Sequence, residues 1–316
     1  MGYNAVGTPT FYVDAVLLAR QWGMITSSTN DFGKYYLNPT KVTEIQMASD
    51  SLNKHIYLDF AQRYWCNSIT HLFVLGHNLH SDDIGIDGKI QYLSNDIMTN
   101  EPLFSDNTTE NGWTKYTFGK KDTNNALRLV TTFTSDTMGD SFLLGDLSAG
   151  WSYKMPHSPD LQLTQTIDNE SVKSQNTKSG HTLTSSSYNQ QAGWIRPAWS
   201  TGTSNSSDFN NNNFKVFPSG RRSWNLKFSY INDTDLFPEE YNSSYGIFDS
   251  NAGAYSIKDN FHSKIMMGTN NFQLPFIFQP NSDVEEYAIC RVVNKPSFNQ
   301  VANNVYDTSM DIVEVF

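Results

Sequence analysis

The sequence predicts an all-β protein made of two β-sandwiches of the jelly-roll type, preceded by an N-terminal arm with one short helix. Charged residues make up only 17% of the chain, against about 25% in typical globular domains. Asn, Ser and Thr replace the missing charge, and such residues suit short strands and turns better than solvent-facing helices. Several segments also alternate apolar and polar residues with the period of a half-buried strand.

The N-terminal arm is predicted to span residues 1–44. Residues 10–13 are extended in character, and a helix over 14–22 begins at Asp14, a good N-cap, and stops at Gly23. The arm holds more apolar surface than one short helix can bury, so we expect it to pack against the body of the chain or a neighbouring subunit. The side chains assigned to this assembly role are Phe11, Val13, Leu17, Leu18 and Trp22.

The first sandwich is predicted over residues 45–145. Residues 54–60 alternate apolar and polar side chains, as in a half-buried strand. The continuous apolar run 72–75 ends at Gly76 and is typical of a strand buried on both faces. Further strands are predicted at 84–90, 113–118, 126–133 and 141–144.

The second sandwich is predicted over residues 146–316. The strongest signal is the alternation of aromatic and polar side chains over 224–230. Pro275 within 273–278 indicates an edge position or a strand start. Residues 200–214 are of low complexity and predict an exposed loop. Other strands are predicted at 161–167, 287–293 and 306–315.

The charge and the cysteines restrict the partners and the compartment. A net charge of −10 and a pI near 5.1 disfavour binding to nucleic acid or to an anionic membrane. No apolar run approaches about 18 residues, so no membrane span is predicted, and we expect no secretory signal. Cys66 and Cys290 lie far apart beside apolar neighbours and are predicted to be buried free thiols.

A cluster of histidines and aspartates follows the apolar run 72–75. His71, His77 and His80, with Asp82 and Asp83, offer nitrogen and oxygen donors, and if residues 76–83 form a loop the last four could converge on one metal ion. The alternative is a turn at a strand end, where Gly76 permits the turn and His77 and Asn78 satisfy backbone groups. The spacing matches no recognised zinc motif. We therefore favour the turn and predict no metal and no cofactor.

Two acidic pairs and several tryptophans are the remaining candidates. The pairs Glu239–Glu240 and Glu285–Glu286 adjoin turns, and neighbouring residues of a strand point to opposite faces, so neither pair forms a glycosidase dyad automatically. Aromatic rings could stack on carbohydrate, although in a strand-rich chain most fill the core. No phosphate-binding loop or nucleophile turn is found, and no catalysis is predicted. The tryptophans in question are Trp151, Trp194, Trp199 and Trp224.

Some segments resemble a known class of protein. Residues 56–88, with IYLDF and HLFVLGHNLHSDDIGIDG, resemble the discoidin-like, galactose-binding-type jelly rolls attached to many phage virion proteins, in which a buried strand runs into a Gly-His-Asn turn. LGDLSAGWSYKMPHSPDL at 144–161, GRRSWNLKFSYI at 220–231 and the segment from Leu274 are similar to virion structural proteins of marine tailed phages. The resemblance covers most of the chain as scattered short motifs.

This resemblance implies a structural component of a tailed-phage virion. The expected place is the tail, baseplate or neck, with a capsid-associated position less favoured, and the particle would assemble in the host cytoplasm. The implied partners are copies of the chain itself and other virion proteins. One alternative is a carbohydrate-binding adhesin whose first sandwich contacts a host-surface glycan, and another is a glycan hydrolase.

Overall fold

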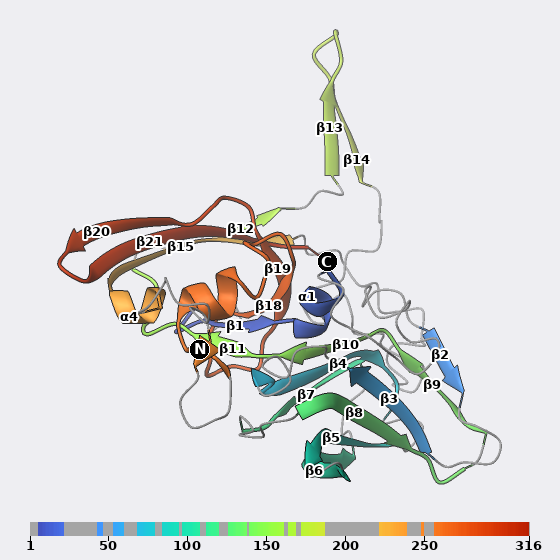
Figure 1. Ribbon diagram of the computed structural model, residues 1–316. Helices are drawn as coiled ribbons and strands as arrows, with labels where there is room; N and C mark the ends of the chain where they lie inside the picture. Colours follow the sequence, from blue (N-terminus) through green and yellow to red (C-terminus); the bar gives the residue numbers. More distant parts are fainter. Residues whose placement is uncertain are drawn as a thin grey trace.

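The structure is a computed structural model. It describes residues 6–21, 43–46, 53–59, 68–79, 84–94, 97–107, 112–119, 126–137, 139–160, 164–168, 172–186, 221–238, 248–249 and 256–315. These residues form mostly antiparallel strands with few helices, so the all-β prediction is confirmed (Figure 1). Among them, no helix has both the length and the apolar character needed to cross a membrane.

The largest sheet joins the two ends of the described chain. Its strands run in the order β11-β1-β18-β19-β21-β15-β12, and β20 pairs with β21 beside this path. The predicted arm therefore supplies an internal strand, β1, in which Phe11 lies opposite Tyr153 on one side and Phe278 on the other. The strands are β1 (Thr10–Val13), β11 (Ser152–Lys154), β12 (Thr164–Asp168), β15 (Arg221–Asn232), β18 (Phe276–Gln279), β19 (Ala288–Val292), β20 (Ser297–Ala302) and β21 (Val305–Glu314).

The remaining strands form smaller sheets. A three-stranded sheet has the order β10-β4-β7, and a four-stranded sheet has the order β3-β8-β5-β6. Three pairs complete the set: β2-β9, β13-β14 and β16-β17. The strands are β2 (Thr43–Gln46), β3 (Asn53–Asp59), β4 (His71–His77), β5 (Gly85–Ser94), β6 (Ile97–Asn107), β7 (Gly112–Thr117), β8 (Ala126–Thr134), β9 (Ser141–Leu144), β10 (Asp146–Gly150), β13 (Val172–Asn176), β14 (Thr182–Ser186), β16 (Phe248–Asp249) and β17 (Ser256–Ile257).

Strand β4 lies at the centre of the packing. Every residue from His71 to His77 is buried, as the apolar run 72–75 predicts. On one side β4 pairs with β10, with Leu147 opposite Val74. The hydrogen bonds of this sheet thus cross residue 146, where the sequence predicts a boundary between two sandwiches. The division of the chain at that residue stays a prediction, and the sheet is continuous across it.

One continuous core includes side chains from all three predicted parts of the chain, among them Phe11, Ile86 and Ile312. A second cluster fills the space between β4 and the largest sheet and includes Tyr12 and Phe73. The predicted arm is the clearest example of this sharing. Its members Phe11, Val13 and Leu18 are at most 1% exposed. They pack against the body of the chain, Leu17 is half-buried, and Trp22 lies outside the described residues.

The helices are short and begin where local chemistry allows. Helix α1 (Ala15–Gln21) follows Asp14, whose Oδ1 accepts a hydrogen bond from the Leu17 backbone N–H at 2.9 Å, as an N-cap does. Gly150 lets β10 approach the end of β1, because a Cβ there would lie 1.9 Å from the Val13 carbonyl oxygen. The other helical segments are α4 (Asp233–Leu236) and the π-helical turn η3 (His262–Met266).

Candidate functional site

The predicted metal-binding loop begins with groups that already have protein partners. His77 is fully buried; its Nε2 lies 2.9 Å from the Thr114 hydroxyl, and its Nδ1 accepts the Leu79 backbone N–H at 3.4 Å. Asn78 Oδ1 accepts a hydrogen bond from the Leu143 backbone N–H at 2.6 Å. Gly76 has φ +65° at an irregularity in the pairing of β4 with β7. Both His77 ring nitrogens and the side-chain oxygen of Asn78 thus hold the end of the strand.

The rest of that predicted site lies outside the described residues, namely His80, Asp82 and Asp83. Within the described ranges, no three or more His, Cys, Asp or Glu side chains gather as a metal site would require. His71 lies at the other end of β4, in contact with the rings of Tyr12 and Phe73, with centroid distances of 5.0 and 5.5 Å. Burial lowers the pKa of His71 to about 3 and that of His77 to about 4. Both imidazoles are therefore neutral at physiological pH.

The acidic pairs separate in the structure. Glu239 and Glu240 lie outside the described residues. Glu285 is exposed, whereas the side chain of Glu286 is 11% exposed and binds Arg222. The two members of the second pair therefore lie in different surroundings, in the segment that precedes β19.

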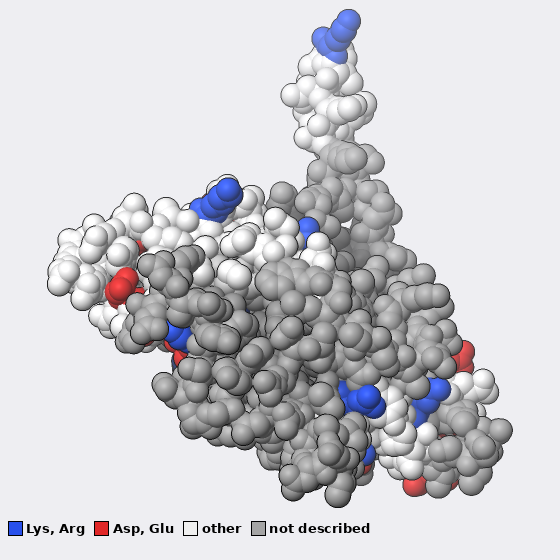
Figure 2. Space-filling model, in the orientation of Figure 1, with Lys and Arg blue, Asp and Glu red and all other residues white. Residues whose placement is uncertain are grey.

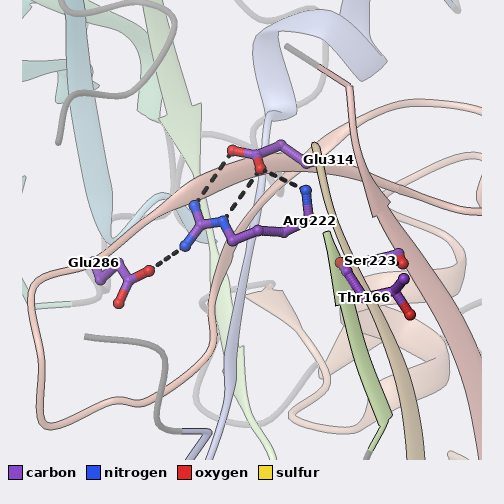
Figure 3. Close-up of polar contacts among 5 residues, drawn as sticks. All are labelled: Thr166, Arg222, Ser223, Glu286 and Glu314. Carbon is purple, nitrogen blue, oxygen red and sulfur yellow. Dashed lines mark hydrogen bonds and ion pairs between the residues drawn. The ribbon is translucent and has the colours of Figure 1, made fainter. Parts of the chain in front are cut away.

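Arg222 on β15 is the centre of a buried ionic cluster (Figure 3). Its Nε and Nη2 donate to the two carboxylate oxygens of Glu314 at 3.2 and 3.3 Å, and its backbone N–H donates to Oε2 at 3.1 Å. Its Nη1 donates to Glu286. The guanidinium lies 5.2 Å from the centroid of the Trp224 ring. The cluster ties together β15, the end of β21 and the segment that precedes β19.

The electrostatics of this cluster indicate a structural clamp. Burial opposes the charge on Arg222, but the carboxylates of Glu314 and Glu286 outweigh it and the pKa of the guanidinium is raised. Burial raises the pKa of Glu286, and Arg222 offsets this only in part. Burial also raises the pKa of Cys290 well above its usual value, which keeps this thiol protonated at neutral pH. Both carboxylates are engaged by the guanidinium, which leaves neither of them positioned as a free acid or base.

The predicted aromatic platforms are buried where the structure describes them. Trp151 and Trp224 are each 1% exposed, and the Trp151 Nε1–H donates to the Lys264 carbonyl oxygen at 2.8 Å. Trp194 and Trp199 lie outside the described residues. An exposed ring occurs instead at Tyr230, which is 78% exposed and has φ +62° at an irregularity of β15.

A small cavity of about 190 Å³ lies between α1, β10 and the strands β18 and β19. Its walls are mainly apolar, with Leu17 from the predicted arm and Ile289 among them. Asp14 and Asp146 also line it. Asp14 accepts the Leu17 N–H at the start of α1, and Asp146 accepts the Leu147 N–H at the start of β10. The carboxylates therefore have local structural roles.

The feature that the core does not explain is the hairpin formed by β13 and β14. It rises away from the body of the molecule (Figure 1), and each of its strands has the other as its main contact among the described elements. The side chains described along 174–183 are exposed apart from Thr177, which is half-buried, and Leu183 is 61% exposed. We take this hairpin as the candidate interaction surface.

The turn of the hairpin is well ordered by its own hydrogen bonds. The Gly180 N–H donates to the Thr177 carbonyl oxygen at 3.0 Å, and Gly180 has φ +83°, which glycine adopts without strain. Thr177 Oγ1 donates to the His181 carbonyl oxygen at 3.0 Å. Figure 2 shows basic atoms at the tip and no acidic atoms along the described part of the hairpin. The hairpin thus presents a formed backbone with a polar, basic surface.

This hairpin was not predicted from the sequence. Residues 172–186 read VKSQNTKSGHTLTSS, which lacks the apolar alternation by which a half-buried strand is recognised. The only local signal is the Ser179-Gly180 pair, which marks a turn. Because none of the described side chains of this hairpin is buried, its sequence needs no apolar alternation from which a strand could be predicted.

Comparison with known proteins does not place the chain in a family. No protein-family model matches the sequence, and a search of curated proteins gives no significant match.

Proposed function

We propose that this chain is a structural component of a tailed-phage virion, in the tail, baseplate or neck, and that it acts through protein–protein contacts. The observation that carries the proposal is the projecting β13–β14 hairpin. A two-stranded hairpin alone is marginally stable in water, because ordering its backbone costs entropy that burial must offset. None of the side chains described along 174–183 is buried within its own chain, so a partner is the natural source of the missing contacts.

The surface chemistry of the described residues supports an assembly role. Two of the groups that could serve chemistry have structural partners: His77 closes a strand end, and Arg222 engages both Glu286 and Glu314. The resemblance of scattered segments to phage virion proteins supplies the class of particle. Assembly in the host cytoplasm, and contacts with copies of the chain and with other virion proteins, belong to the same proposal.

The finer architecture predicted from the sequence also belongs to the proposal. An arm over 1–44 and jelly-roll sandwiches over 45–145 and 146–316 would have to share the sheet in which β10 pairs with β4. We therefore expect the sandwiches to unfold together, as one thermal transition, because separating them would break that pairing. Two well-resolved transitions would contradict this architecture.

The direct test of the proposed function is recovery of the chain from intact particles. Particles of a phage that encodes the chain would be purified from infected cells by density banding. They should yield peptides of the chain by mass spectrometry at a constant ratio to the major coat protein. Antibodies against the chain should label one end of the particle in electron micrographs. Absence of the chain from purified particles would refute the proposal.

The alternatives make different predictions. The adhesin hypothesis, with a host-surface glycan as partner, now depends on residues outside the buried Trp151 and Trp224. Specific signals on a glycan array that disappear when an exposed aromatic such as Tyr230 is changed would favour it. Turnover of host polysaccharide, abolished by Glu→Gln changes, would favour the hydrolase.

A further inference from the structure

The hairpin has the opposite charge to the rest of the chain. Residues 172–186 contain Lys173, Lys178 and His181 and no Asp or Glu, whereas the whole chain has a net charge of −10. Copies of such a chain repel one another unless a basic surface on one copy meets an acidic surface on another. The tip at Lys178 and the exposed Leu183 would be complementary to a partner surface that is acidic and partly apolar.

A surface of that kind lies in the segment that connects β18 to β19. Val284 is 36% exposed, and both of its chain neighbours, Asp283 and Glu285, are exposed acids. Among the large apolar side chains exposed in the described residues, Val284 alone has acids on both sides. Those side chains are Leu183, Tyr230, Val284, Val293 and Val301.

The segment around Val284 is held in place before any partner binds. The Val284 N–H donates to the Asn281 carbonyl oxygen at 3.1 Å, and its carbonyl oxygen accepts from Gln279 Nε2 at 2.9 Å. The Asp283 N–H donates to Asn281 Oδ1 at 3.1 Å, and the Ser282 N–H donates to the Thr8 carbonyl oxygen at 2.9 Å. A surface ordered in advance loses little entropy when it binds.

We propose that the β13–β14 hairpin of one copy docks on the 281–286 segment of a second copy. Leu183 would pack against Val284, and the basic tip would face Asp283 and Glu285. This inference rests on the proposed function, because it names the partner of the assembly surface. Donor and acceptor are different surfaces, so the contact is heterologous and generates a ring or an open chain of copies.

The test is sedimentation velocity of the full chain with paired variants. The wild-type chain should self-associate, and the association should weaken as salt rises from about 0.05 to about 0.5 M, because screening shortens the reach of the charges. Leu183→Ser and Val284→Ser should each raise the dissociation constant about tenfold or more. An equimolar mixture of the two variants should form dimers at wild-type affinity, because each retains one intact half of the contact.

A charge exchange tests the electrostatic part. Lys178→Glu and the pair Asp283→Lys with Glu285→Lys should each weaken association, and mixing them should restore it. Val293→Ser is the matched control, since Val293 is 62% exposed and lacks acidic chain neighbours. A wild-type chain that stays monomeric at high concentration, or variants that fail to complement one another, would overturn this inference. Recovery of the same chain from purified particles would leave the proposed function standing in either case.

Discussion

Strand β4 and the β13–β14 hairpin have the same antiparallel hydrogen bonding but differ in the burial of their side chains. Every residue of β4 is buried, between β10 and β7 within its sheet. The hairpin has a comparable backbone ladder, yet Leu183 is 61% exposed. The comparison teaches that backbone pairing alone does not give an element its stability. Side-chain burial makes β4 part of the core, and its absence leaves the hairpin free for a partner.

The largest difference should appear when a buried ring is removed from the predicted arm. Phe11 contacts the rings of Phe276 and Phe278 at centroid distances of 5.5 and 5.2 Å. Phe11→Ala should lower the free energy of unfolding by about 3–5 kcal/mol, because it leaves a cavity among rings. Leu183→Ala on the hairpin should change it by less than about 0.5 kcal/mol. Urea denaturation of the two variants measures both, and equal losses would break the comparison.

The next effect concerns the buried charges. Arg222→Met leaves Glu286 and Glu314 buried without their cation, which should destabilise the protein by about 3 kcal/mol or more. Adding Glu286→Gln and Glu314→Gln should restore much of the loss, since no uncompensated charge remains. Lys227→Met is the matched control on the same strand, because Lys227 is exposed, and it should be nearly neutral. A small loss for Arg222→Met would mean that water reaches the cluster.

The sequence predicted the buried half of this comparison better than the exposed half. The run 72–75 and the cap at Asp14 are local signals, and local signals gave β4 and α1. The pairing of β10 with β4 depends on register between distant segments, which no local pattern records.

The candidate site was predicted least well. Arg222, Glu286 and Glu314 are far apart in sequence and meet because β21 pairs with both β15 and β19. The hairpin escaped prediction because its strands bury none of their described side chains and so lack apolar periodicity. Local patterns therefore find elements that pack against the core, and they miss contacts between segments distant in sequence and elements whose described side chains are not buried.

The two histidines of β4 give a smaller, pH-dependent effect. Burial lowers the pKa of His71 to about 3 and of His77 to about 4, below the usual value of about 6.5 in the unfolded chain. The unfolded state therefore binds more protons. The contribution of each neutral imidazole to the free energy of unfolding is complete above about pH 6.5. It is lost as the pH falls toward the pKa of the folded state. As the pH falls from 7 to 5, each histidine should lower the free energy of unfolding by roughly 2 kcal/mol.

Variants separate these histidines from other titrating groups. His71→Leu and His77→Gln should each flatten the dependence of unfolding free energy on pH between 7 and 5. Leu183→Ala, on the exposed hairpin, removes no titratable group and should leave the dependence unchanged. Chemical denaturation at several pH values measures all three. If the β4 variants keep the wild-type slope, the buried imidazoles are not the source of acid sensitivity.

The smallest effect on folding, and the sharpest statement of the comparison, is removal of the hairpin itself. Replacing residues 172–186 by a four-residue Gly-Ser turn should change the unfolding free energy by about 0.5 kcal/mol or less, because no described side chain of the hairpin is part of the core.

Hydrogen exchange gives the same information without mutation. In dilute solution the amides of 176–182 should exchange many times faster than those of 72–75, whose opening requires global unfolding. At concentrations where copies associate, the hairpin amides should become protected while those of β4 stay unchanged. Hairpin protection equal to that of β4 at every concentration would show that the hairpin is stabilised within its own chain, and its need for a partner would disappear.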